Sequence, residues 1–141
     1  NSVTDIIIKF VKEKKRKIYG GYAINQLVME KDKKLGFYTD LDIPDIDFYS
    51  PEPLSDLKEL CDKIFDASYR PVEGREAQHK ETYTIFVNYQ KYCDITYVPA
   101  NIYHKIRFIL NLFPSKSPIL NFCSLHISCI NSYLVPLNVY D

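Results

Sequence analysis

The chain has 141 residues, with 18 basic and 18 acidic side chains, a formal charge of zero, 46% hydrophobic residues and 26% charged residues. This composition is that of one ordinary globular domain, and the balanced charge excludes a nucleic-acid binder that depends on overall positive charge. The four cysteines form no CxxC pair and no histidine lies at zinc-finger spacing, which argues against a structural zinc site and favours free thiols in a reducing compartment.

The first predicted element is a helix from Thr4 to Lys17, which carries one apolar stripe at helical spacing. Its last turns are basic from Lys12 to Lys17. We interpret this run as a solvated helix end, with contact to the phosphate backbone of a nucleic acid as the alternative. Gly20-Gly21 is expected to end this helix, and a second helix is expected from Tyr22 to about Lys33, closed by Gly36.

A strand is expected from Asp45 to Ser50, in which the carboxylates of Asp45 and Asp47 share one face and the apolar side chains the other. Two prolines end this strand and introduce an amphipathic helix that continues to about Ala67. The segment from Tyr69 to Lys80 is expected to be a loop.

A β-hairpin is predicted next, since the runs Thr82 to Asn88 and Tyr92 to Val98 are rich in β-branched and aromatic residues and only Tyr89-Gln90-Lys91 separates them. In the second strand, Asp94 is expected to share its face with Thr96. The neighbouring apolar residues are expected to face the core.

Helical spacing returns from Ile102 to Phe113, and Leu125 to Ile130 has the composition of a strand. The stretch from Ser117 to Tyr140 has no charged residue, but its apolar runs are short and it contains prolines, so we expect a buried segment rather than a membrane span. The order of elements predicts an α+β fold, a small mixed β-sheet with helices packed on one face.

Three carboxylates in this framework suggest a metal site. Asp45 and Asp47 are two residues apart on a strand and point the same way, and Asp94 would come from a neighbouring strand. Magnesium prefers oxygen ligands, and two such ions held together can serve phosphoryl transfer. An Asp-x-Asp pair is also common as a solvated strand end, but the apolar strands around these residues favour a function. A second pair, Asp40 and Asp42, is the alternative ligand set.

Gly20-Gly21 is the other candidate motif. The purely structural interpretation is a turn that ends the first helix. The functional interpretation is that the glycines let the backbone approach a triphosphate, with the amides that open the next helix pointing at it. The position of the pair ahead of the acidic strand favours the second interpretation.

These motifs resemble the nucleotidyltransferase superfamily of the DNA polymerase β type. The resemblance rests on Tyr19-Gly20-Gly21-Tyr22, on Pro44-Asp45-Ile46-Asp47-Phe48 and on Cys93-Asp94-Ile95-Thr96. Within the superfamily, the residues from Tyr19 to His104 are similar to the poly(A) polymerase catalytic subunit of large cytoplasmic DNA viruses, both mimivirus-like and poxvirus-like. The fold implied is the polymerase β-like nucleotidyltransferase fold.

The resemblance implies an enzyme that adds AMP from ATP to RNA 3′ ends without a template, by a two-metal mechanism, in viral mRNA polyadenylation. The cofactor implied is Mg²⁺, as two ions, with Mn²⁺ as a substitute. Asp94 would lie at the ion nearer the RNA 3′ hydroxyl. The site residues implied are Asp45, Asp47 and Asp94 as catalytic metal ligands, and Gly20, Gly21 and Tyr22 as nucleotide-binding residues.

Further expectations concern partners and location. Residues 1–141 are expected to form a nucleotidyltransferase catalytic domain, and a start at Asn1 rather than Met suggests a fragment or reduced form of a longer protein. The implied partners are ATP, an RNA 3′ end, and either a second copy or a processivity subunit, with no membrane. The implied location is cytoplasmic, in the viral factory or the virion.

Two other functions remain open from the sequence. One is a nucleotidyltransferase that modifies an acceptor other than RNA. The other is a noncatalytic member of the fold that serves as an RNA-binding or subunit-docking module. Intact carboxylates at all three positions argue against the noncatalytic alternative.

Overall fold

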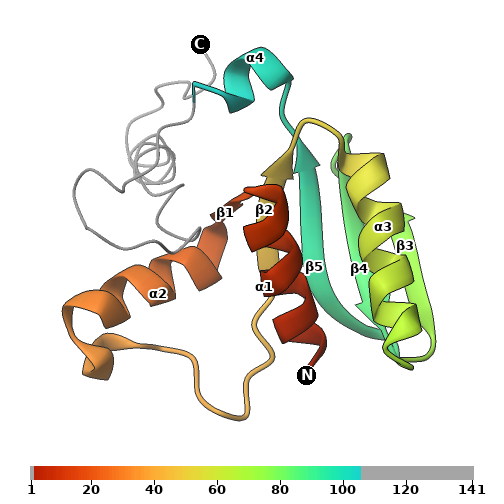
Figure 1. Ribbon diagram of the computed structural model, residues 1–141. Coiled ribbons are helices and arrows are strands. Elements are labelled where there is room, and N and C mark those ends of the chain that lie inside the picture. Colours follow the sequence, from red (N-terminus) through yellow and green to blue (C-terminus); the bar gives the residue numbers. More distant parts are fainter. Residues whose placement is uncertain (1, 106–141) are drawn as a thin grey trace.

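The computed structural model describes residues 2–105, in which five strands form one mixed sheet (Figure 1). The order across the sheet is β1-β2-β5-β4-β3. β2 and β5 run parallel, and the other neighbouring strands are antiparallel. This arrangement confirms the predicted α+β class. The strands are β1 (Lys17–Tyr19), β2 (Ile46–Ser50), β3 (Val72–Glu76), β4 (Thr82–Val87) and β5 (Gln90–Tyr97).

Two helices, α1 (Val3–Lys14) and α3 (Pro53–Asp66), cover one face of the sheet side by side, as expected (Figure 1). The apolar stripe of each helix packs on the inward side chains of the strands, and Phe10 and Phe48 lie with ring centroids 6.2 Å apart. Burial of these side chains drives the packing of this layer. The largest fully buried side chains of the core are Ile7, Phe10, Ile18, Ile46, Phe48, Leu60, Ile64, Ile85 and Ile95.

The opposite face carries a smaller apolar cluster near the end of β2 and β5. Tyr49, Val98 and Tyr103 are buried there, and Tyr19 stacks on Tyr49 at 4.1 Å between ring centroids. The short helix α4 (Ala100–Tyr103) follows β5 and supplies Tyr103. The Tyr103 hydroxyl donates to the backbone carbonyl of Lys15 at 2.6 Å. This small cluster leaves the rest of the second face available for polar residues.

A buried ion pair joins α3 to the segment before β1. The Arg16 guanidinium donates to both oxygens of Asp56, at 2.7 and 3.1 Å. Asp56 is only 1% exposed. Such a bidentate pair is directional, so it fixes the chain entering β1 against α3.

The first helix ends earlier than the sequence predicted, because the basic run does not continue the helix. α1 stops at Lys14, Lys15 takes the left-handed conformation at φ 54°, and the Arg16 N–H donates to the Val11 carbonyl at 3.0 Å. This is the bond pattern of a Schellman-type ending. The chain then forms β1, a strand that the sequence analysis missed because it is only three residues long.

The second helix begins two residues before the predicted start. α2 spans Gly20–Lys31, so Gly20 and Gly21 form its first turn and do not precede it. A 3-10 turn, η1 (Lys33–Leu35), follows before Gly36. α2 packs against β1 and β2 at the edge of the sheet (Figure 1).

The prediction of a loop over residues 69–80 is wrong, since β3 lies within it. Glu73 is half-buried while Arg75 and Glu76 are exposed, and Gly74 has no side chain, so the usual apolar alternation is missing. β3 exists because its backbone pairs with β4 at the edge of the sheet.

The hairpin between β4 and β5 is confirmed, with a tighter turn than expected. β5 begins at Gln90, so only Asn88 and Tyr89 form the loop, both at positive φ (50° and 64°). Two left-handed residues are what the favoured two-residue hairpin loop requires. Lys91 therefore belongs to the strand.

Several expectations lie outside the described residues. These are the part of the predicted helix beyond 105, the strand from Leu125 to Ile130, and the uncharged segment from Ser117 to Tyr140. Among the described residues, Cys61 and Cys93 are free thiols.

Candidate active site

The pairing register places four polar residues in one row across the sheet. Tyr19 of β1 lies opposite Asp47 of β2, and Asp47 lies opposite Asp94 of β5. Asp94 in turn lies opposite Thr84 of β4. The face that carries this row is the one that α1 and α3 leave uncovered. The predicted faces of Asp47 and Asp94 are therefore confirmed.

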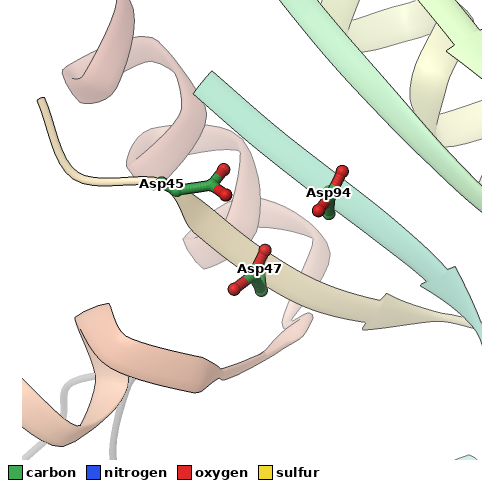
Figure 2. A group of neighbouring side chains, drawn as sticks. All are labelled: Asp45, Asp47 and Asp94. Atoms are coloured by element: carbon green, nitrogen blue, oxygen red, sulfur yellow. The ribbon is translucent and has the colours of Figure 1, made fainter. Parts of the chain in front are cut away.

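Three carboxylates converge at this row. Asp45 lies just before β2, Asp47 on β2 and Asp94 on β5, as Figure 2 shows. One carboxylate oxygen from each residue lies within 4.8 Å of the other two. The structure thus brings together the three carboxylates that the sequence analysis singled out.

Hydrogen bonds orient this row from the side of β4. Thr84 donates its hydroxyl to Asp94 at 2.5 Å. The Thr96 hydroxyl, two residues further along β5, lies 2.8 Å from the Tyr19 hydroxyl and 3.1 Å from that of Thr82. The bond from Thr84 holds the side chain of Asp94 in one orientation.

Lys91 completes the cluster, and the sequence analysis did not place it. Its ammonium forms ion pairs with Asp45 at 2.9 Å and with Asp94 at 2.6 Å. Burial alone would lower the pKa of Lys91, but the hydrogen bonds to Asp94 and Asp45 raise it, so the ammonium stays charged. Lys91 was expected in the hairpin loop, but the structure places it on β5, where the register against β4 shifts.

Two of the carboxylates, Asp47 and Asp45, have raised pKa values in this arrangement. Burial, and then the charges of Asp45 and Asp94, raise the pKa of Asp47 to about 8. Burial also raises the pKa of Asp45, against the opposing effect of Lys91. Three acidic groups placed together repel one another when ionised, so the cluster favours a binding partner with positive charge.

The three carboxylates are suited to divalent cations that prefer oxygen ligands. All three ligand groups are carboxylates, the ligand type that Mg²⁺ takes in sites which also include water and substrate phosphates. The Oδ1 atom of Asp45 is buried and has no hydrogen-bond partner among the described residues. A buried carboxylate oxygen without a donor is costly unless a cation meets it. We therefore regard Asp45, Asp47 and Asp94 as the residues able to hold metal.

The raised pKa of Asp47 predicts how stability depends on pH. Asp47 ordinarily titrates at 3.8, but in the metal-free fold its pKa is about 8. Between these values the folded state binds a proton that the unfolded state does not, so this contribution is complete below pH 4 and is lost as pH rises to 8. In EDTA, we expect urea denaturation to give lower stability at pH 8 than at pH 5.

The matched variant for this measurement is Asp47→Asn, which cannot titrate. Its stability should fall less over the same pH range than that of the unmodified protein. Added Mg²⁺ should stabilise the unmodified protein more at pH 8 than at pH 5, because the metal competes with the proton. Equal pH dependence in the two proteins would contradict the assignment.

Gly20 has a specific steric reason to be glycine. Its φ of +80° is in the left-handed region, and an added Cβ would lie 2.6 Å from Oδ2 of Asp47. The backbone that opens α2 therefore passes directly against the acidic cluster, which only a residue without a side chain allows.

Substitution of Gly20 by alanine is expected to weaken the site. A side chain at this positive φ costs about 1–2 kcal/mol of folding free energy. Asp47 must also shift to make room for the added Cβ. We expect a lower urea midpoint and Mn²⁺ affinity reduced by at least about tenfold, measured by electron paramagnetic resonance. Gly36→Ala is the control, since the nearest atoms to its Cβ belong to the flexible side chain of Met29. Equal effects of both substitutions would contradict this explanation.

The long connection between α2 and β2 folds back over the glycines. The buried Asn25 side chain accepts the backbone N–H of Phe37 at 2.8 Å and that of Tyr38 at 3.4 Å. An added Cβ at Gly21 would lie 2.8 Å from the Tyr38 hydroxyl. Burial, followed by the charges of Asp47 and Asp45, raises the pKa of Tyr38. Tyr38 is thus a neighbour of the site that no sequence motif indicated.

The N-terminus of α2 leaves its amides without a side-chain cap. Tyr19 is the N-cap residue and forms no side-chain cap bond, in contrast to Ser2 of α1, which forms a capping box. The first amides of a helix otherwise lack partners. The Tyr22 side chain itself packs against the main core, so its backbone, but not its ring, lies with the two glycines.

The alternative acidic pair does not join the cluster. Asp42 accepts hydrogen bonds from the Thr39 backbone N–H and hydroxyl, at 2.7 and 2.9 Å, in an exposed turn. Asp40 is exposed as well. Within residues 2–105, the acidic residues close enough to share a metal ion are Asp45, Asp47 and Asp94.

The basic run from Lys12 to Lys17 is not simply a solvated helix end, so that interpretation is wrong for two of its members. Arg16 and Lys17 are buried, and the Lys17 ammonium donates to the Tyr103 carbonyl at 2.5 Å. Lys14 pairs with Glu59 on α3 at 2.8 Å. These three basic residues therefore serve the packing of the domain.

None of the helices in the described part of the chain has both the length and the apolarity of a membrane span.

Comparison with known proteins points to one family. Residues 5–131 match the model of the poly(A) polymerase catalytic subunit family. A protein of Acanthamoeba polyphaga mimivirus, assigned as a poly(A) polymerase catalytic subunit, is 42% identical over 108 residues, which make up 77% of this chain and 18% of that protein. A protein of African swine fever virus with the same assignment is 28% identical over 102 residues, 72% of this chain and 21% of the relative.

A solved structure agrees with these relatives. The crystal structure of the Megavirus polyadenylate synthase matches with a TM-score of 0.71 and 52% sequence identity. The match covers 76% of this chain and 22% of that one. The chain therefore spans about a fifth of the length of the relatives it matches.

Proposed function

This chain belongs to the family of poly(A) polymerase catalytic subunits, and from this premise we propose that it carries the adenylyl-transfer centre of such an enzyme. The reaction is the template-independent addition of AMP from ATP to the 3′ end of RNA. The 3′ hydroxyl gives up its proton to solvent as its oxygen bonds to the α-phosphorus, the bond from that phosphorus to the β-phosphate oxygen breaks, and pyrophosphate leaves.

The observation that carries this proposal is the convergence of three carboxylates on the uncovered face of the sheet. Their oxygens lie within 4.8 Å of one another, and one buried oxygen of Asp45 has no donor among the described residues. This donor set supports metal binding at Asp45, Asp47 and Asp94. Bound there, magnesium ions, or manganese in their place, would activate the RNA hydroxyl and neutralise charge on the leaving pyrophosphate.

The residues around the cluster position it for this work. Thr84 fixes Asp94 by a hydrogen bond, and Gly20 allows the start of α2 to approach Asp47. Because most catalysis in phosphoryl transfer is positioning and electrostatic stabilisation, a rigid cluster on paired strands suits it.

The triphosphate is proposed to bind at the start of α2. Gly20, Gly21 and Tyr22 would offer backbone N–H groups and the positive end of the helix dipole. The missing side-chain cap and the closeness of Gly20 to Asp47 support this position.

Other parts of the proposed function concern the longer protein. We propose that the chain is its catalytic domain and that the remaining length of such proteins supplies further RNA contacts. A second copy or a separate subunit would supply processivity. The viral relatives favour the viral factory or the virion as its location.

The test is primer extension by the longest natural form of the protein, with a short labelled RNA, Mg²⁺ or Mn²⁺, and each nucleoside triphosphate separately. We expect a ladder of products with ATP and none with EDTA. The 141-residue chain tested alongside would show whether it needs the rest of the protein to hold RNA.

Two results would overturn the proposal. Transfer of AMP to a protein or small molecule, but not to RNA, would identify a nucleotidyltransferase with another acceptor. RNA binding with no transfer by the longest form, under either metal, would identify a noncatalytic docking module.

A further inference from the structure

We propose that Lys91 is an internal cation of the acidic cluster, which divalent metal displaces and whose released ammonium then binds a phosphate of the incoming nucleotide. The inference deepens the proposed function and rests on it. It assigns to Lys91 the coupling of metal binding to nucleotide binding.

The first observation is the position of the ammonium. It lies 2.9 Å from Oδ2 of Asp45 and 2.6 Å from Oδ2 of Asp94, so it bridges two of the three carboxylates. The carboxylates it bridges are also ligands available to a metal ion. The Asp94 side chain is only 17% exposed, whereas that of Lys91 is 42% exposed. The ammonium thus reaches into the cluster from its open side.

The second observation is that the strand is built to aim Lys91 at this cluster. In a regular strand, residues three apart point to opposite faces, so Lys91 and Asp94 would be separated. The register between β4 and β5 shifts here, since Ile85 pairs with Cys93 but Phe86 pairs with Lys91. Tyr92 is therefore the extra residue of a β-bulge.

The burial of the side chains agrees with this bulge. Tyr92 and Cys93 follow one another, yet both pack in the main core. Two consecutive side chains on one face return Lys91 to the face that carries Asp94. Bulges next to functional sites commonly redirect a side chain in this way.

Electrostatics explain why a metal ion would displace the ammonium. A metal ion bound to Asp45 and Asp94 would take the carboxylate oxygens that the ammonium now contacts, and at that range its charge would repel the ammonium. A divalent ion has twice the charge and can also meet the donorless oxygen of Asp45. Lys91 has a flexible stem and its side chain is partly exposed, so it can swing away without disturbing β5.

The nucleotide offers the released ammonium a new partner. Lysine binds phosphate oxygens as a point charge. A triphosphate at the start of α2 would lie beside Asp47, which pairs with Asp94 in the sheet. The free energy needed to displace the ammonium is then smaller when nucleotide is present, because the ammonium gains a phosphate as its new partner. In turn, the nucleotide binds more tightly once the metal has displaced Lys91 from the carboxylates. This coupling must be reciprocal.

The test compares Lys91→Met with a matched control, Lys58→Met, on α3 on the opposite side of the sheet. Mn²⁺ affinity is measured by electron paramagnetic resonance in the longest natural form, with and without a nonhydrolysable ATP analogue. In Lys91→Met we expect Mn²⁺ alone to bind about tenfold more tightly. We also expect the increase in affinity caused by nucleotide to shrink by about tenfold. Lys58→Met should behave like the unmodified protein.

The outcomes separate this inference from the proposed function. Unchanged or weaker Mn²⁺ binding in Lys91→Met, while the unmodified protein binds Mn²⁺, would overturn the role of Lys91 only. No Mn²⁺ binding by either protein would overturn the metal site itself.

A second measurement needs no variant. Reductive methylation of lysines, read by mass spectrometry, should modify Lys91 slowly in the metal-free protein. The rate should rise with Mn²⁺ alone and fall again with Mn²⁺ and the nucleotide analogue, while Lys58 stays constant. A methylation rate of Lys91 that changes with neither Mn²⁺ nor the nucleotide analogue would overturn the proposal.

Discussion

Replacing Asp47 by asparagine is expected to lower the rate of AMP addition to RNA by at least about a thousandfold, a loss of about 4 kcal/mol of transition-state stabilisation. Asp47 sits in the middle of the row, paired with Tyr19 on one side and Asp94 on the other. An amide in its place loses the negative charge that binds metal. The measurement is single-turnover primer extension at saturating ATP, in the longest natural form.

The fold should survive this change. Asn has nearly the same shape as Asp, and the substitution removes repulsion from Asp45 and Asp94, which helps to raise the pKa of Asp47. The metal-free variant should be at least as stable as the unmodified protein at pH 8. Asp40→Asn is the control, because that carboxylate lies in the exposed loop and should leave the rate unchanged. A large loss of rate in Asp40→Asn, with full activity in Asp47→Asn, would move the metal site to the other acidic pair.

Replacing Asp56 by alanine is expected to destabilise the domain by about 3–5 kcal/mol. The carboxylate accepts two hydrogen bonds from Arg16 at 2.7 and 3.1 Å, and both side chains are buried. Without Asp56 the guanidinium stays buried and keeps, among the described residues, only the distant, exposed carboxylate of Glu52 as an ion-pair partner. Urea denaturation at pH 7 measures the change in free energy of unfolding.

Glu52 provides a matched control on the same arginine. Its carboxylate lies 3.9 Å from Arg16 and its side chain is 72% exposed. Exposed pairs contribute about 0–1 kcal/mol, so Glu52→Ala should change stability little. Similar losses in both variants would show that the charge of the neighbourhood, and not the buried geometry, stabilises this corner.

The sequence was sufficient for the elements whose patterns are long and regular. α3 has apolar residues at helical spacing over 14 residues, and in β2 the buried Ile46 and Phe48 lie on either side of Asp47. It was not sufficient for β1 and β3. β1 has three residues, too few for a period, and β3 has an exposed, charged sequence whose strand conformation comes from pairing with β4.

The residues of the candidate site also fall into those that could be predicted from the sequence and those that could not. Strand alternation predicted that Asp45 and Asp47 point together, and the predicted neighbouring strand supplied Asp94. Lys91 could not be placed, because its direction depends on the bulge at Tyr92, a feature of pairing between strands. Tyr38 could not be placed either, since it reaches Gly21 only through hydrogen bonds from its loop to Asn25.

The row across the sheet also has a consequence for folding. Its members come from β1, β2, β5 and β4, and the central parallel pair joins residues 47 positions apart, from Asp47 to Asp94. Contacts that close such long stretches of chain form late and slowly. A partly folded chain would bring at most one or two of the carboxylates into place. Metal would therefore bind the complete sheet and shift the folding equilibrium toward it. Catalytic competence and completion of the fold would then be gained in the same step, and folding intermediates would lack the means to act on nucleotides.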